Sequence, residues 1–155
     1  LIQTCKELSV ITAATGVKPA IVYVSFVPGA LPDWNQGISS ESPTAGAGEA
    51  RDSDQLELVV VSEKGPAIYR RLSVTRGELL KTAREFRRTV SDPLRRNSQA
   101  YLSTAQKLYS WLVAPYETAL VDRQIQNLVF IMDAGLRTLP IGALHDGNQF
   151  LVEKY

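Results

Sequence analysis

Cysteine and histidine are scarce in this chain of 155 residues, which contains one of each, Cys5 and His145. A single cysteine excludes an internal disulfide and a multi-cysteine zinc site, and it fits a reducing cytosol. One histidine cannot make a metal site by itself. We therefore predict no metal and no cofactor. Neither residue sits in a pattern typical of a catalytic thiol and imidazole pair, so we expect no catalytic residue in this chain.

Long hydrophobic runs and net charge are also lacking. The longest apolar runs, such as residues 128–132, fall far short of the ~18 residues of a membrane span. The formal net charge is +1, which favours neither nucleic acid nor an anionic membrane as a partner. With 45% hydrophobic and 21% charged residues, the composition is typical of one soluble globular domain. We expect a cytoplasmic protein.

Strand and helix patterns alternate along the chain. Residues 20–27, 55–62, 67–74 and 127–133 are apolar or β-branched runs that predict strands, the second and third forming a hairpin around Gly65. Helices are predicted at residues 1–15, 76–90 and 101–120, with Thr4/Glu7 and Thr75/Glu78 as capping boxes and an interruption at Pro115. Residues 149–155 have an extended pattern.

The segment of residues 29–54 differs from the rest because Gly, Ser, Ala, Pro and Asp dominate it. It contains too few large apolar residues to bury, so we predict a disordered loop.

These elements predict an α/β fold with a mostly parallel central sheet. Residues 127–133 form a short strand whose interior, residues 128–132, is wholly apolar, which is typical of a central parallel strand. An α+β sandwich with both long helices on one face is the alternative fold. A chain that ends in an extended segment leaves a sheet edge open, so we expect the domain to be truncated.

Asp133 and Arg137 follow the predicted strand at residues 127–133, where open α/β sheets place ligands. Both could contact a ligand. Alternatively, Asp133 caps the turn and Arg137 braces the loop by a bidentate contact. Leu136, Leu139 and Pro140 favour the brace, which predicts a buried, hydrogen-bonded Arg137.

The segment from Arg70 to Arg96 is the one strong charge asymmetry, with nine basic residues against three acidic ones. Lys81, Arg84 and Arg88 share a helical face opposite the apolar stripe, which would suit an acidic protein or a phosphate backbone. The alternative is a solvated face. Nucleic acid is the weaker option because no aromatic residues lie between the basic ones.

Several runs together resemble the first half of a CHAT domain. They are residues 18–26 (KPAIVYVSF), 100–115 (AYLSTAQKLYSWLVAP), 127–140 (NLVFIMDAGLRTLP), 143–147 (ALHDG) and 150–155 (FLVEKY). That family is caspase-like and often follows tetratricopeptide repeats, notably in cyanobacteria. The resemblance implies a three-layer α/β/α lobe of a cysteine peptidase domain.

In the family, peptide cleavage depends on a His and a Cys that follow later strands, each within its own motif. Neither motif occurs here: His145 lies in a Leu-His-Asp-Gly turn, and Cys5 precedes the first strand. The resemblance therefore implies a non-catalytic N-terminal portion, whose partner is the remainder of the parent domain and its tetratricopeptide repeats. The alternative is a pseudo-enzyme interaction module that uses the basic face.

Overall fold

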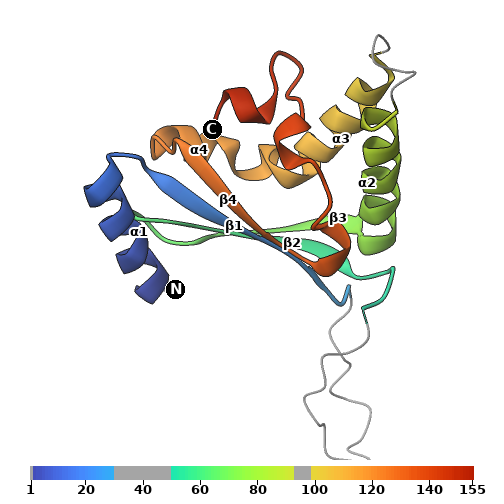
Figure 1. Cartoon of the computed structure of the whole chain (residues 1–155). Coiled ribbons are helices and arrows are strands. Elements are labelled where there is room, and N and C mark those ends of the chain that lie inside the picture. The colour runs from blue at the N-terminus through green and yellow to red at the C-terminus, as the bar shows by residue number, and fades with distance from the viewer. Residues whose placement is uncertain (1, 30–49, 93–98) are drawn as a thin grey trace, which may run out of the picture.

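The computed structural model describes residues 2–29, 50–92 and 99–155. They form a four-stranded sheet with helices, a mixed α/β fold, and every predicted helix and the first four predicted strands are present (Figure 1). The elements are α1 (Ile2–Thr15), β1 (Pro19–Val27), β2 (Gln55–Ser62), β3 (Ile68–Thr75), α2 (Arg76–Val90), α3 (Leu102–Leu112), α4 (Glu117–Asp122) and β4 (Asn127–Met132). Short 3₁₀ turns are η2 (Gln99–Tyr101), η3 (Ala114–Tyr116), η4 (Ala134–Leu136), η5 (Ile141–Ala143) and η6 (Leu151–Glu153).

The sheet is mixed, so the prediction of a mostly parallel sheet is wrong. Its strand order is β3-β2-β1-β4. β2 pairs antiparallel with both β1 and β3, whereas β4 pairs parallel with β1. The short connection at residues 63–67 can only make an antiparallel hairpin, while β4 arrives after α2, α3 and α4 and can run parallel to β1.

β4 lies at the edge of the sheet, so its predicted central position is also wrong. Among the described strands it pairs with β1 alone. Leu128, Phe130 and Met132 are partly buried against the core, whereas Val129 and Ile131 are 45% and 48% exposed. An apolar run of five residues is therefore buried on one face only, a difference that its sequence does not reveal.

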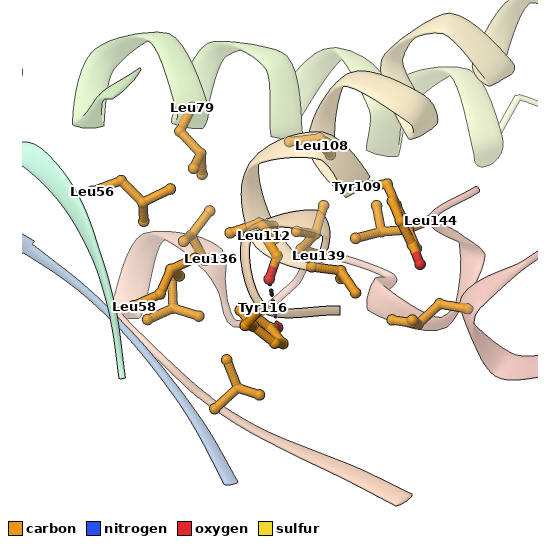
Figure 2. Packing of buried hydrophobic residues seen from close by; sticks show 14 of the residues in the cluster. Leu56, Leu58, Leu79, Leu108, Tyr109, Leu112, Tyr116, Leu136, Leu139 and Leu144 are labelled. Atoms are coloured by element: carbon orange, nitrogen blue, oxygen red, sulfur yellow. Dashed lines mark hydrogen bonds between the residues drawn. The ribbon is translucent and has the colours of Figure 1, made fainter. Parts of the chain in front are cut away.

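The core lies between one face of the sheet and the layer formed by α2, α3 and the turns around them (Figure 1). Figure 2 shows Leu56 and Leu58 of the sheet facing Leu112, Tyr116 and Leu136. The Tyr116 hydroxyl donates a hydrogen bond to the Leu112 carbonyl, which satisfies the polar end of a buried ring. Both long helices thus share one face, as in the α+β alternative.

α1 covers the opposite face. It contacts β1 and β2, and its Cys5 and Ser9 line the same cavity, of about 430 Å³, as Val61. Val61 alternates along β2 with Val60, which belongs to the core, so the two side chains lie on opposite faces.

Local signals in the sequence set several element ends. Thr75 caps α2, its hydroxyl accepting a hydrogen bond from the Glu78 amide at 3.3 Å. Gly65 has a φ of +84° in the β2–β3 turn, which only glycine adopts easily. The capping box at Thr4 and Glu7 is wrong, because α1 begins at Ile2 and contains both residues.

The predicted extended segment at residues 149–155 is not a strand. One isolated bridge joins His145 to Phe150, and the chain then turns into η6. The Glu153 carboxylate accepts a hydrogen bond from the Phe150 amide at 2.7 Å, which starts that turn. The argument for truncation from an extended C-terminal segment therefore fails. Most of the predicted disordered loop at residues 29–54, residues 30–49, lies outside the described residues, and its disorder stays a prediction.

Candidate functional site

Cys5 and His145 do not form a pair. Cys5 lies on α1, on the far face of the sheet, while His145 follows η5 on the helical side and contacts the Phe150 ring edge-on at 4.8 Å between centroids. The His145 Nδ1 accepts a hydrogen bond from the Gly147 amide at 2.9 Å. With the sheet between them, thiol and imidazole cannot exchange a proton. Within the described ranges no group of His, Cys, Asp and Glu could hold a metal ion.

Asp133 and Arg137 lie at the carboxyl end of β4, and the structure gives them different surroundings. The Asp133 carboxylate caps η4 by accepting a hydrogen bond from the Gly135 amide at 3.1 Å. Arg137 is exposed and has no hydrogen bond or ion pair to any described residue. The capping alternative for Asp133 is thus present, whereas the prediction that Arg137 is a buried brace is wrong.

The spacing of the buried leucines explains the exposure of Arg137. Leu136 and Leu139 are 0% and 7% exposed, and residues three apart lie on one side of a 3₁₀-like turn. Arg137, directly after Leu136, therefore faces away from the core. A ligand role for Asp133 and Arg137 stays a prediction.

The most connected polar cluster in the described structure surrounds Lys154, which we call the Lys154 clamp. Its ammonium donates to Glu117 Oε1, to Asp146 Oδ2 at 2.9 Å and to the Tyr109 hydroxyl at 3.0 Å. Tyr109 in turn donates to Glu117 Oε1 at 2.7 Å. An ammonium has three N–H donors, so none is left for a ligand. The clamp fixes η6 to α3 and α4 and is structural.

The contacts and burial of the Lys154 clamp shift the pKa values of the residues that form it. Burial alone would raise the pKa of Asp146, but the Gln149 amide and the Lys154 ammonium outweigh it and hold the pKa well below its usual range. Burial would also raise the pKa of Glu117, yet hydrogen bonds from Lys154 and Tyr109 lower it. For Tyr109, burial dominates and raises the pKa to about 12. Burial would lower the pKa of Lys154, but its hydrogen bonds raise it above the usual value.

Arg123 is the arginine that braces a loop. Its Nη1 donates to Ser62 Oγ at 2.8 Å and its Nη2 to the Pro66 carbonyl at 2.9 Å. It follows α4, so these bonds tie the β2–β3 turn to the end of that helix. A Cβ at Gly65 would lie 3.0 Å from the same guanidinium, which is a second reason for glycine there.

The basic residues between Arg70 and Arg96 differ in their surroundings. Arg70, Arg71 and Arg76 contact the Pro115 carbonyl, the Gln55 amide and the Asp52 carboxylate respectively. Arg95 and Arg96 lie outside the described residues. The predicted face remains: Lys81, Arg84 and Arg88 are exposed on α2 and form no hydrogen bond or ion pair with any described residue.

The sequence did not predict the roles of Lys154 and Arg123. Both residues act on partners dozens of positions away, such as Glu117 for Lys154 and Ser62 for Arg123. No local spacing signals such contacts. The only available signal was the Asp146-Gly147 turn, whose carboxylate accepts hydrogen bonds from the Asn148 and Gln149 amides.

No helix among the described residues is both long and apolar enough to cross a membrane.

The comparisons with known proteins bear on the C-terminal part of the chain. No curated protein and no solved structure matches the chain. The family model of the CHAT domain matches residues 102–155, from the start of α3 through η6, and confirms the resemblance to the CHAT domain over this part of the chain.

Proposed function

We propose that this chain is the non-catalytic N-terminal portion of a caspase-like cysteine peptidase domain of the CHAT family. In this proposal it supports a catalytic lobe formed by residues beyond Tyr155, in a cytoplasmic parent that also carries tetratricopeptide repeats. The CHAT match at residues 102–155 is the observation that carries it. The separation of Cys5 from His145 by the sheet supports a non-catalytic role for this portion.

The three-layer, caspase-like arrangement belongs to the same proposal. One face of the sheet is covered by α2 and α3, and α1 lies on the other. β4 has a free edge among the described strands, and its Val129 and Ile131 are partly exposed. A further strand beside β4 and a further helix over these side chains would complete the layers.

Peptide hydrolysis tests the proposal. We expect the isolated chain to hydrolyse no fluorogenic peptide, because no thiolate and imidazolium pair can form. The longer parent polypeptide should hydrolyse peptides and should keep its activity after Cys5→Ala. Turnover by the isolated chain that disappears on Cys5→Ala, with the fold intact, would refute the proposal. So would a parent sequence without a His and a Cys after two further apolar strands.

A second function is an interaction module that binds an acidic partner through the basic face. The observation that favours it is the exposure of Lys81, Arg84 and Arg88 without a counter-ion in the described structure. Exposed basic side chains on one helix face attract anionic partners. Binding of acidic peptides by the isolated chain, lost at high salt, would support this function, and the absence of any such binding would refute it.

A further inference from the structure

A groove of about 150 Å³ lies between α2 and the loop that follows β4. α2 and η4 are in contact, so the groove joins the two segments that the sequence singled out separately, the basic helix face and the loop after the strand. The residues that line it are Ala83, Arg84, Arg87, Gly135, Thr138 and Leu139.

Small residues make this groove hollow. Ala83 and Gly135 contribute a methyl group and no side chain respectively. The loop approaches α2 so closely that a Cβ on Gly135 would lie 2.8 Å from Leu80 Cδ2. Glycine therefore permits the close contact of loop and helix, and Arg84 and Arg87 contribute the long side chains that line the groove.

The polar groups of the groove are mainly hydrogen-bond donors. Arg87 Nη1 donates to the Thr138 hydroxyl at 2.6 Å, which holds this guanidinium beside the groove, and no other donor of Arg87 is bonded to a described residue. Arg84 has no hydrogen bond or ion pair with any described residue. The nearest carboxylate on the loop, Asp133, already accepts the Gly135 amide.

We propose that this groove binds the oxyanion of an acidic side chain, a carboxylate or a phosphate, presented by a peptide segment of a partner protein. Arg84 and Arg87 would donate the hydrogen bonds, since guanidinium forks fit such groups in bidentate geometry. The proposal deepens the interaction function stated above and does not depend on the peptidase-supporting one.

The size and surroundings of the groove favour a single side chain over a nucleic-acid strand. Its volume of about 150 Å³ is that of a small group. A strand of nucleic acid would need several phosphate contacts and aromatic side chains for base stacking. None of the described residues that line the groove is aromatic.

Fluorescence anisotropy with labelled peptides tests the proposal. The probes are a short Glu-rich peptide, the same peptide with phosphoserine at its centre, and a Gln-substituted control. We expect the first two to bind and the control to bind weakly. Arg84→Gln and Arg87→Gln should each weaken binding roughly tenfold, the loss expected for a charge-assisted hydrogen bond. Displacement of the labelled peptide by inorganic phosphate would show that a free oxyanion is sufficient for binding. A lack of displacement would show that contacts with the peptide are also needed. Both results are compatible with an oxyanion site in the groove.

Arg51→Gln is the matched control, because Arg51 is exposed, lies outside the basic face of α2 and does not line the groove. It should change affinity less than twofold, and thermal melts should show that all the variants are folded. Arg88→Gln separates the groove from the rest of the basic face, and it should weaken binding less than either groove variant because Arg88 does not line the groove. Equal losses for Arg84, Arg87 and Arg88 variants would overturn the groove and leave a diffuse basic face. No binding of any acidic peptide would overturn both the groove and the interaction function. Tighter binding of a DNA oligonucleotide, weakened by the same two variants, would overturn the choice of a peptide partner.

Discussion

Replacing Lys154 by Met should destabilise the protein more than any other removal of one surface charge. Methionine keeps most of the apolar stem but removes the ammonium that bridges Glu117 and Asp146. Two carboxylates and the Tyr109 hydroxyl would then face one another without a cation. The tie between η6 and the α3–α4 region would be lost with it.

The partial exposure of the clamp determines how much unfolding free energy the Lys154→Met variant should lose. The side chains of Lys154, Glu117 and Asp146 are 17%, 29% and 14% exposed, so the clamp is neither fully buried nor in free solvent. Breaking a buried pair costs about 3–5 kcal/mol, and an exposed pair contributes about 0–1 kcal/mol. We expect a loss of about 2–3 kcal/mol between these limits. For a chain of this length the melting temperature would fall by roughly 4–12 °C.

Lys107→Met is the control. Lys107 also makes an ion pair, with Glu78 at 3.3 Å, and also lies over an aromatic ring, that of Trp111. Its side chain is 50% exposed, however, and its partner's is 48% exposed. The variant should therefore lose less than about 1 kcal/mol. Urea unfolding followed by circular dichroism measures both variants, and an equal or larger loss for Lys107→Met would refute the reasoning.

The effect of Lys154→Met should also depend on pH. The clamp lowers the pKa of Glu117 and of Asp146 in the folded state. Groups of this kind stabilise the fold fully above their unfolded pKa values, about 4, and lose that contribution as the pH falls through the lower folded values. The difference between wild type and variant should be largest near neutral pH and shrink below about pH 4. A difference that stays constant down to pH 2 would contradict the assignment.

Two further outcomes follow from the same contacts. Arg123→Ala should lower the free energy of unfolding by about 1–2 kcal/mol because it removes two hydrogen bonds. Arg137→Ala should change it by less than about 0.5 kcal/mol because Arg137 is exposed. Thermal melts of the two variants measure this order of stability, and the reverse order would contradict the reasoning. Burial raises the pKa of Tyr109 to about 12 and that of Tyr116 further, so stability should fall as pH rises above the unfolded value of about 10. Urea unfolding at pH 8 and pH 11 measures this loss, and equal stability at both would contradict it.

Local patterns in the sequence were sufficient for most elements of the fold. Thr75 marks the start of α2, Gly65 marks the hairpin turn, and apolar runs mark the strands. These patterns could not predict the strand order, because a run such as residues 128–132 can be equally apolar at the centre of a sheet or at its edge. Edge or centre depends on which strands pair beside it, and pairing is a long-range property of the chain.

The same difference between local patterns and long-range contacts explains which parts of the candidate site the sequence could predict. The sequence correctly placed Lys81, Arg84 and Arg88 on an exposed face, because the position of a residue on a helix follows from its period. It could not show that Arg87 bonds Thr138 across a groove that Arg84 also lines, since that contact joins segments about fifty positions apart.

The wrong prediction for Arg137 has a physical lesson of its own. It assumed that an arginine between buried leucines must be buried with them, but a 3₁₀ turn repeats every three residues. Leu136 and Leu139 can enter the core together only if the residue after Leu136 points outward. The bracing role falls instead to Arg123 and Lys154, which approach their partners from other elements and can therefore tie those elements together. An arginine within the loop would have tied it mainly to itself.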